Sequence, residues 1–370
     1  MSKKLGAVPY QTIIGMIADG SIKGALESSV RPASLDLRLS DEFYRVDGIF
    51  LPRPGEKVRN ILPEMGAVEH SLDYPLERGV TYLARLEESL ELKEDIYGYS
   101  NPKSSTGRND IHARVIADGV SRYDTTAPAG FSGELWLAIE PRSYPVRLKP
   151  GVSLSQIRFF NHDTRFNEEE LMFYFERDQL LWHKGRPLSY NEINIKDDDG
   201  ALILTAELED ALVGYECRGS GKVLDFSLKG HYQPEEFFQP LKSSKGTVLL
   251  KKDSFYIIRT KEAVRVPPHF SSEVVPMDER SGEFRTHYAG FFDPGWGWGE
   301  NGEGKGRRGV LEIRPFSDVL LRDGQPVAKF RFEKMMEAPE ANYDAMPDSN
   351  YNSKEEENLP RLSKHFKVPV

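Results

Sequence analysis

Short apolar runs separated by turn-forming residues recur along most of the chain. Turn signals at about 8–12-residue spacing are typical of an all-β sandwich or barrel, and they argue against βαβ units. The pattern therefore predicts a mainly β protein. The predicted strands lie at 33–39, 81–86, 134–140, 152–160, 201–209, 223–230, 246–252, 254–260, 309–315 and 326–333.

Helical periodicity is confined to two segments. Apolar residues at helical spacing over 13–17, followed by a glycine, predict one short helix. Residues 166–182 predict a second helix, and the acidic, turn-prone segment after it, 194–200, is typical of a linker. The polar segment 346–360 has few apolar residues, which indicates a solvated tail.

The two halves of the chain resemble each other. Residues 81–108 and 255–285 each contain a strand, an acidic turn, a second strand and a basic turn that ends in arginine. An aromatic-aspartate pair, a glycine next to an aromatic residue and an apolar strand follow in both halves. A repeat of this length indicates duplication of one domain, because solenoid repeats are shorter. We expect domains at 1–165 and 200–370, with a helix and an acidic linker at 166–199 between them.

Composition places the chain among ordinary globular proteins. Apolar residues make up 39% of it, and 20 Phe and 16 Tyr supply material for real cores. The net charge of -9 argues against a nucleic-acid partner but allows local basic pockets for a small anion. The single cysteine excludes internal disulfides and fits a reducing compartment. Since no segment has the ~18 apolar residues of a membrane span and no apolar signal-peptide core is present, we expect a cytoplasmic protein without a membrane partner.

Candidate chemistry is concentrated at 279–315, a segment rich in glycine and arginine. It does not match a nucleotide-binding P-loop, because Lys305 is followed by glycine instead of Ser or Thr and the next element is a predicted strand. A long hairpin between two strands is the favoured interpretation of its glycines.

Each half carries a basic turn with hydroxyl groups, KSSTGR in the first and RSGEFR in the second. Such a turn suits a polyphosphate, because the arginine fork binds two oxygens while the hydroxyls and turn N–H groups fill other positions. A solvated turn without a ligand is the alternative for either hexapeptide. The candidate residues are Lys103, Ser104, Ser105 and Arg108 in the first turn and Arg280, Ser281 and Arg285 in the second.

One strand of the second half carries a carboxylate among apolar residues. Leu311 and Ile313 share one face of the strand GVLEIRP. Glu312 lies on the other face, with Val310 and Arg314. Charges are rare in such strands, and partial burial would raise the pKa of the carboxyl toward neutrality, as a proton shuttle requires. The alternative is an exposed glutamate paired with an arginine.

The first half lacks this carboxylate. Alignment of the two apolar strands places Ala138 opposite Glu312, and Glu140 lies on the same face but further along the strand. We therefore expect catalysis in the second half only.

These residues resemble a known family. RSGEFR, AGFFDPGW and GVLEI are similar to motifs of the dCTP deaminases, in the trimeric dUTP pyrophosphatase superfamily, and the chain most resembles their long, internally duplicated form. RPASLDLRLSDEF resembles an early strand of that family, and segment 342–366 resembles its C-terminal closing segment. The resemblance covers about residues 8–160 and 200–366. It implies two tandem dUTP pyrophosphatase-like distorted β-barrels (jelly-roll or β-clip) with a few short helices.

The resemblance also implies a role for each matched residue. Glu312 would be the catalytic acid and base, while Ser281 and Arg285 would position the attacking water and the cytosine. The other substrate contacts that it implies are Arg280 and Tyr343 at the phosphates, Asp293 at the deoxyribose, Ala289 and Val310 at the base, and Lys354 in the tail.

Three departures from the family pattern bear on these roles. Gly282 replaces a serine, Lys354 replaces a glutamine of the tail, and residues 297–308 lengthen the hairpin before the catalytic strand. In this family each site is built across an interface between domains. The intact KSSTGR turn of the first half is therefore expected to serve the phosphates beside Glu312, although RSGEFR stays open as the alternative.

The function that the resemblance implies is hydrolytic deamination of dCTP to dUTP and ammonia, which supplies dUTP for dUMP and dTTP synthesis. The alternatives are dUTP hydrolysis to dUMP, alone or combined with deamination, and a non-catalytic nucleotide-binding regulator. One cysteine cannot supply the zinc site of other deaminases, so we expect no metal site and no tightly bound cofactor. Mg²⁺ would arrive with the triphosphate. We expect a homo-oligomer with sites at domain interfaces.

Overall fold

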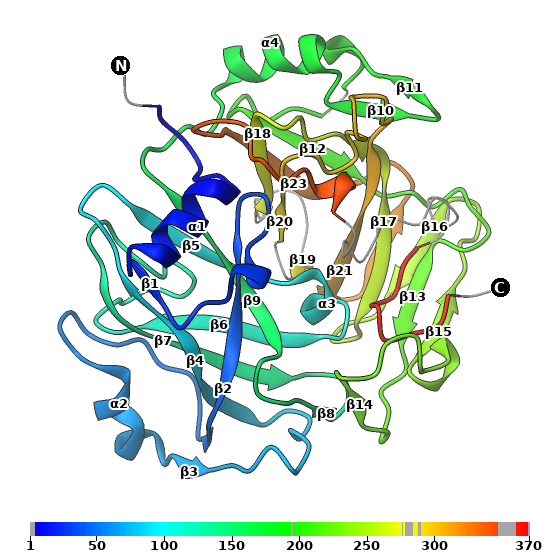
Figure 1. Cartoon of the computed structure of the whole chain (residues 1–370). Coiled ribbons are helices and arrows are strands. Elements are labelled where there is room, and N and C mark those ends of the chain that lie inside the picture. The colour runs from blue at the N-terminus through cyan, green and yellow to red at the C-terminus, as the bar shows by residue number, and fades with distance from the viewer. Residues whose placement is uncertain are drawn as a thin grey trace. The chain divides into compact units, whose positions relative to one another are not determined.

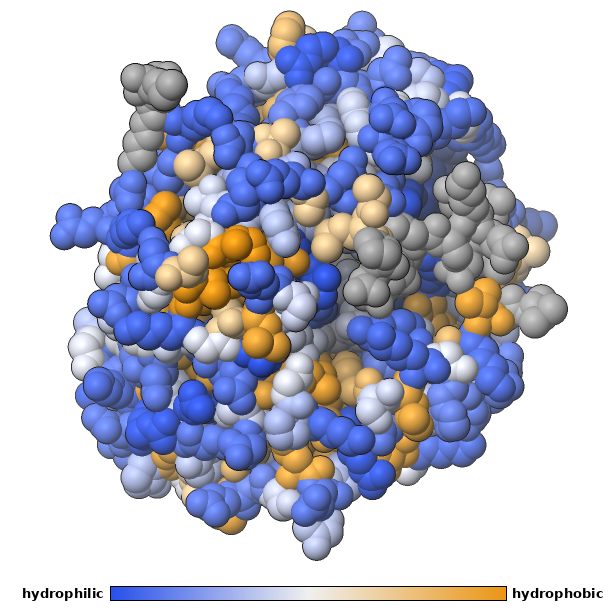
Figure 2. Space-filling model, in the orientation of Figure 1, coloured by the Kyte–Doolittle hydropathy of each residue, from blue (hydrophilic) through white to orange (hydrophobic). Residues whose placement is uncertain are grey.

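The structure is a computed structural model in which strands dominate and helices are short, so the mainly β fold class is confirmed (Figure 1). It describes residues 4–193, 195–275, 277, 284–287, 290–346 and 360–368, and of 284–287 the backbone alone. No helix in these ranges is long and apolar enough to cross a membrane. The face shown in Figure 2 is mostly hydrophilic, with apolar residues in small groups.

The chain divides into two compact units. The N-terminal unit includes two segments from late in the sequence, and the C-terminal unit includes the first few residues. Their ranges are 8–162, 218–237 and 363–370 for the N-terminal unit, and 1–7, 163–217 and 238–362 for the C-terminal unit.

The N-terminal unit is built on one large antiparallel sheet. Its strands are β1 (Ile22–Lys23), β2 (Leu35–Val46), β3 (Val68–Glu69), β4 (Thr81–Glu91), β5 (Tyr97–Pro102), β6 (Ile111–Ala117), β7 (Ser132–Pro141), β8 (Val146–Arg147), β9 (Ser153–Phe160) and β14 (Leu224–Asp225). Its helices and 3-10 turns are α1 (Tyr10–Ala18), α2 (Val58–Ile61), α3 (Ser104–Gly107), η1 (Glu27–Ser29), η2 (Leu62–Met65) and η4 (Pro234–Glu236). The sheet order is β5-β9-β2-β4-β7-β6, and β14 forms a separate parallel pair with β8.

In its described residues the C-terminal unit holds three sheets. Its strands are β10 (Leu181–His183), β11 (Arg186–Pro187), β12 (Ala201–Thr205), β13 (Gly214–Cys217), β15 (Phe238–Leu241), β16 (Thr247–Leu250), β17 (Tyr256–Val264), β18 (Phe270–Val275), β19 (Phe284–His287), β20 (Phe291–Phe292), β21 (Arg307–Pro315), β22 (Val319–Arg322) and β23 (Pro326–Lys334). Its helix is α4 (Glu168–Asp178), with 3-10 turns η3 (Tyr190–Glu192) and η6 (Tyr343–Ala345). One sheet has the order β11-β10-β17-β13-β15, with β21 paired to β17 and β19 to β21; the others are β12-β23-β18-β20 and β16-β22.

Both predicted helices are present, as α1 and α4. α4 begins with a capping box, because the Asn167 side chain accepts from the N–H of Glu170 at 2.9 Å and the Glu170 carboxylate accepts from the N–H of Asn167 at 3.3 Å. It ends at Asp178, earlier than predicted, because Gln179 adopts a left-handed φ of 52°. The chain then enters β10.

The acidic segment after α4 is tied to β23. Lys329 pairs with Asp197 at 2.7 Å and with Asp199 at 2.6 Å. Arg331 pairs with Asp199 at 2.9 Å. These ion pairs hold the segment on the sheet of the C-terminal unit.

The duplication is visible in the strand registers. In the N-terminal unit β4 pairs with β7, and in the C-terminal unit β17 pairs with β21 in the same way. The paired positions are Leu83–Ala138 and Arg85–Trp136 in the first pair, and Ile257–Glu312 and Arg259–Val310 in the second. Ala138 therefore holds the position of Glu312, as the alignment predicted.

The glycine-rich insertion before β21 folds back on itself as a hairpin-like loop, because the N–H of Gly306 donates to the carbonyl of Gly297 at 3.0 Å. The predicted hairpin between two strands is not formed, since β20 and β21, which the insertion joins, lie in different sheets. The guanidinium carbon of Arg265 lies 4.0 Å from the ring centroid of Trp298, and Arg265 also donates to the carbonyl of Gly302. Gly297 has a φ of +69°, and a Cβ there would lie 2.7 Å from the carbonyl oxygen of Val264. Glycine thus allows the hairpin backbone to approach β17 closely.

Candidate active site

Glu312 lies on β21 between two neighbouring strands. Its backbone is paired with Ile257 of β17 on one side and with His287 of β19 on the other. Leu311 and Ile313 belong to the hydrophobic core, which confirms the predicted alternation. Only 5% of Glu312 is exposed, and this contradicts the alternative of a solvent-facing glutamate. The carboxyl group is therefore shielded from bulk water on an inner strand.

A buried arginine lies beside Val310, the predicted wall for the base. Arg259 of β17 is opposite Val310 and is 3% exposed. It pairs with Asp210, and Arg308 lies 3.7 Å from the same carboxylate. Burial, together with the charge of Arg308, lowers the pKa of Arg259 to about 10. Sequence reasoning missed this arginine, although Arg85 at the matching position of the first half was an available signal.

The turn that holds Asp293 is bound to the start of the C-terminal tail. Asp293 is 5% exposed. The N–H of Tyr343 donates to the carbonyl of Pro294 at 3.1 Å. Gly295 has a φ of +92°, and a Cβ on it would lie 1.7 Å from Oδ1 of Asn342. The close approach of η6 to this turn therefore requires glycine.

Asp344 connects η6 to the hairpin and to β21. Its carboxylate pairs with Arg307 at 2.9 Å and accepts from the N–H of Gly299 at 3.0 Å. Burial raises the pKa of Asp344, although the charge of Arg307 opposes the shift. The tail, the inserted hairpin and the Glu312 strand thus share one anchoring side chain.

Part of the predicted site lies outside the described residues, namely Arg280, Ser281, Ala289 and Lys354. The backbone of Arg285 is described. It lies in β19, opposite Arg314 of β21. Two residues further along β19, the backbone of His287 is opposite Glu312. β19 therefore carries the Arg285 backbone alongside the Glu312 strand.

The KSSTGR turn of the N-terminal unit forms the single helical turn α3. Ser105 and Arg108 are buried, and Ser104 is exposed. Asn109 donates to the carbonyl of Ser105 at 2.7 Å and fixes the end of the turn. The accessible hydroxyl of this turn is therefore that of Ser104.

Lys103, just before α3, forms an ion pair with Asp36 of β2. Asp36 also accepts two hydrogen bonds from Arg31, at 2.9 and 3.0 Å. Burial alone would raise the pKa of Asp36, but Lys103 and Arg31 hold it below its ordinary value. One buried carboxylate is thus shared by two cations.

The predicted match between Arg108 and Arg285 is wrong. In the N-terminal unit His112 of β6 is opposite Glu140 of β7. In the C-terminal unit Arg285 is opposite Arg314. Since the two partner residues hold equivalent positions, Arg285 matches His112 and not Arg108. The two turns have similar residues, but this similarity does not show at which residue the strand after each turn begins.

The N-terminal unit is filled at the position that Glu312 occupies in the C-terminal unit. Ala138 packs in a hydrophobic cluster with Trp136, Val58 of α2 and Leu62 of η2. Trp136 is 0% exposed. The carboxylate is therefore absent here, and apolar side chains of the protein take up the space next to its position.

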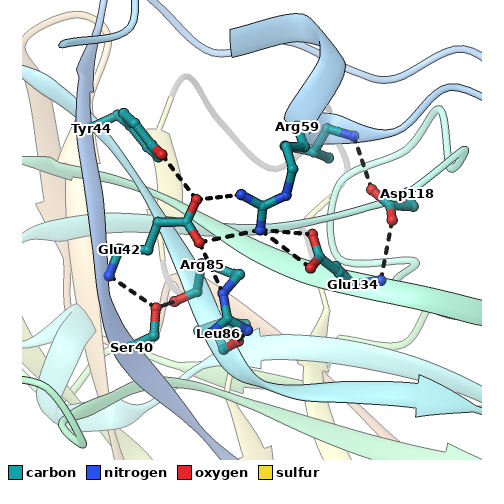
Figure 3. A network of polar contacts seen from close by, with 9 residues as sticks. Ser40, Glu42, Tyr44, Arg59, Arg85, Leu86, Asp118 and Glu134 are labelled. Atoms are coloured by element: carbon teal, nitrogen blue, oxygen red, sulfur yellow. Dashed lines mark hydrogen bonds and ion pairs between the residues drawn. The ribbon is translucent and has the colours of Figure 1, made fainter. Parts of the chain in front are cut away.

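The segments α2 and η2 form a cover over Trp136. A polar network holds α2 on the sheet, as Figure 3 shows. Arg59 of α2 donates to Glu42 at 2.6 Å and to Glu134 at 3.3 Å. Its guanidinium carbon lies 5.3 Å from the ring centroid of Trp136. Asp118 accepts from the first N–H of α2 at 2.9 Å and from the N–H of Glu134 at 3.2 Å. Sequence reasoning missed the cover, although a tryptophan aligned with Val310 was a signal for it.

Candidate metal ligands do not cluster in the parts of the chain that the structure describes. No group of three or more His, Cys, Asp or Glu side chains there is placed to hold a metal ion. Cys217, the single cysteine of the chain, is half-buried at the end of β13.

Two family comparisons together cover most of the chain. Residues 4–163 match the N-terminal domain, and residues 176–366 the C-terminal domain, of the family described as 2'-deoxycytidine 5'-triphosphate deaminase (DCD). The chain belongs to the dCTP deaminase family. The resemblance drawn from the short motifs is therefore confirmed.

Individual dCTP deaminases are similar to the chain over different lengths. A protein of Methanopyrus kandleri named dCTP deaminase, dUMP-forming, is 32% identical over 142 residues, which cover 36% of this chain and 67% of that protein. An Ignicoccus hospitalis protein named dCTP deaminase is 25% identical over 167 residues, which cover 40% of this chain and 84% of that protein. The crystal structure of 2'-deoxycytidine 5'-triphosphate deaminase from Agrobacterium tumefaciens covers 91% of this chain and 100% of its own, with 36% identity and a TM-score of 0.82. The expected dUTP pyrophosphatase-like fold of a dCTP deaminase is thereby confirmed.

Proposed function

We propose that the chain catalyses hydrolytic deamination of dCTP to dUTP and ammonia, with Glu312 as the residue that moves the protons. One observation carries the proposal. A carboxylate that is 5% exposed lies on an inner strand of a dCTP deaminase fold, at the position where the N-terminal unit has alanine. The duplicated units thus differ at the residue that is proposed to move the protons.

The reaction replaces the amino group at C4 of cytosine by oxygen. The attacking water loses a proton, N3 gains one, and the amine must gain another before it leaves as ammonia. One carboxyl group that alternates between base and acid performs these transfers, which contributes about 10²–10⁴-fold to the rate. Pairing of the Glu312 backbone on both sides supports this role, because it limits movement of the carboxyl between the transfers.

The chemistry proposed needs no metal ion. Zinc deaminases hold a metal hydroxide on a His/Cys/Cys set with a P-C-x-x-C motif, and a chain with one cysteine does not contain that motif. Mg²⁺ is expected with the triphosphate instead, because it binds phosphate oxygens and keeps several waters.

The nucleoside contacts proposed are Asp293 for the deoxyribose and Val310 with Ala289 for the base. Contact between the Asp293 turn and η6 supports a closing role for Tyr343, because the tail begins at the turn that would hold the sugar. Ser281 and Arg285 are proposed to position the water and the cytosine.

The triphosphate contacts proposed come from the basic turns. Lys103, Ser104, Ser105 and Arg108 are the candidates of the N-terminal unit, and Arg280, with Lys354 of the tail, those of the C-terminal unit. We also propose that the chain forms a homo-oligomer with its sites at domain interfaces. Sedimentation of the purified protein at several concentrations tests that state directly.

The burial of Glu312 argues against a non-catalytic regulator, which has no need of a shielded carboxylate. The Methanopyrus kandleri relative is named dUMP-forming, so the product of this chain should also be identified. Formation of dUMP would indicate a second reaction, the hydrolysis of dUTP.

The test is release of ammonia from dCTP by the purified full-length protein, with dUTP and dUMP separated by chromatography. Glu312→Gln should lower turnover by at least about 10²-fold and leave the affinity for dCTP within a few-fold. Glu140→Ala is the matched control, because Glu140 lies on the equivalent strand of the N-terminal unit, and it should be nearly silent. Wild-type protein that releases no ammonia would refute the function, and near-normal turnover of Glu312→Gln would refute the role of Glu312.

A further inference from the structure

The inserted hairpin-like loop before β21, here called the inserted loop, is held in shape by its own residues and by Arg265, which follows β17. At the tip of the loop, the Glu303 carboxylate accepts from the N–H groups of Glu300 and Asn301, at 3.1 and 2.8 Å. Near the start of the loop, Arg265 lies over the ring of Trp298. The backbone groups that the loop presents to the tail therefore have fixed positions.

Gly299 of the inserted loop binds the start of the tail with both of its backbone polar groups. Its N–H donates to Oδ2 of Asp344 at 3.0 Å, and its carbonyl accepts from the side-chain amide of Asn342 at 3.4 Å. Oδ1 of Asp344 pairs with Arg307, at the end of the loop, at 2.9 Å, and only 8% of the Asp344 side chain is exposed. Both carboxylate oxygens are thus bound by the loop in a place shielded from water, where such contacts are stronger than at an open surface.

These contacts lie on either side of Tyr343 and fix its position. Asn342 caps η6, because its Oδ1 accepts from the N–H of Asp344 at 3.1 Å. Tyr343 packs against the hydrophobic core of the C-terminal unit, and its N–H donates to the carbonyl of Pro294 at 3.1 Å, next to Asp293. Every group in this arrangement belongs to the chain itself, so the arrangement does not require a bound nucleotide.

The inserted loop is a departure from the pattern of the family, so its contacts with the tail are additional to those that the pattern provides. We propose that this loop is a docking platform for η6, which holds the start of the tail on the Asp293 turn before nucleotide binds, and that Asp344 is the positioning residue of the contact. Residues that are ordered in advance lose less conformational entropy when the substrate binds. The loop thereby raises the affinity of the site without touching the substrate. The inference rests on the proposed deamination of dCTP.

Steady-state kinetics of dCTP deamination tests the role of Asp344. Asp344→Asn removes the ion pair with Arg307 and should raise the KM for dCTP by about 10-fold. The kcat should stay within a few-fold, because bound dCTP can still draw η6 into place. Arg307→Gln should have a similar effect. The double variant should raise KM no further than the larger of the two single changes, since both remove the same ion pair.

Asp318→Asn is the matched control. Asp318 also pairs with a cation, Lys251 at 2.9 Å, and accepts from a backbone N–H, that of Lys252 at 2.9 Å, but it lies on the turn between β21 and β22. Its side chain is 51% exposed, so the substitution should leave KM within about twofold. An equal rise in KM for Asp318→Asn, or an unchanged KM for Asp344→Asn, would overturn the proposal.

Hydrogen exchange of the nucleotide-free protein tests the docking without any need for activity. The N–H of Tyr343 should be protected in the wild type and should exchange at least about 10-fold faster in Asp344→Asn and in Arg307→Gln. Rapid exchange of this N–H in the wild type would refute the platform and leave the proposed function intact. A wild type that protects the N–H but releases no ammonia from dCTP would instead refute the proposed function, and with it the gain in affinity.

Discussion

Trp136→Val tests whether the N-terminal unit fills its own nucleoside position. Valine is the residue that the C-terminal unit carries at the equivalent register position, as Val310. Trp136 is 0% exposed and packs against the cover formed by α2 and η2. The Arg59 guanidinium lies over its ring at 5.3 Å. The substitution therefore removes the largest side chain of the cover contact and keeps a residue that the fold accepts at this place.

The expected loss of stability follows from these contacts. Truncation of a buried tryptophan to alanine costs about 3–5 kcal/mol, and the volume that valine retains reduces this to about 2–3 kcal/mol. Loss of the Arg59 contact adds about 0.5 kcal/mol, because the Arg59 side chain is 46% exposed. We therefore expect the free energy of unfolding of the N-terminal unit to fall by about 3 kcal/mol.

Urea unfolding followed by far-UV circular dichroism measures this loss, with a separate transition fitted for each unit where two are resolved. Tyr74→Ala is the control, because Tyr74 is a 68% exposed aromatic residue of the same unit and should change stability by less than about 0.5 kcal/mol. The filled position also predicts one bound dCTP per chain in calorimetric titration. A loss below about 1 kcal/mol for Trp136→Val, or two dCTP bound per wild-type chain, would refute the reasoning.

Two further predictions concern the tail and its docking. Gly295→Ala should lower dCTP turnover by at least about 10-fold, because its Cβ would lie 1.7 Å from Oδ1 of Asn342 and would displace η6. Gly221→Ala is the control and should not lower turnover, since a Cβ there would have no atom within 4 Å. Equal activities of the two variants would show that the contact with η6 is dispensable. Burial lowers the pKa of His365 from 6.5 to about 4, so its contribution to stability is present above about pH 6.5 and is lost as the pH falls toward 4. His365→Gln should therefore reduce the pH dependence of the unfolding free energy over that range, with a residual slope from His112, whose pKa is also lowered to about 4 by burial. An unchanged slope would contradict the assignment to His365.

A strand prediction succeeded where the alternation of apolar and polar residues within the segment itself specified the strand. The runs at 254–260 and 309–315 correspond to β17 and β21, because alternate residues of both strands enter the core of the C-terminal unit. The run at 223–230 forms only the short strand β14, which pairs with β8 from much earlier in the chain. The length of β14 is set by its pairing with β8, which is distant in sequence, and it could not be predicted from the residues of 223–230 alone.

By itself the sequence determined the fold class, the duplication and the match of Glu312 with Ala138, because alternation and motif order are properties of the linear chain. The tertiary structure alone decided that Arg285 matches His112, since strand pairing sets equivalence and turn composition does not. It also decided that Trp136 is covered by α2, and that the C-terminal segment returns to the N-terminal unit beside the KSSTGR turn. These features depend on contacts between segments far apart in sequence, whose free energy is gained only when the whole chain is folded.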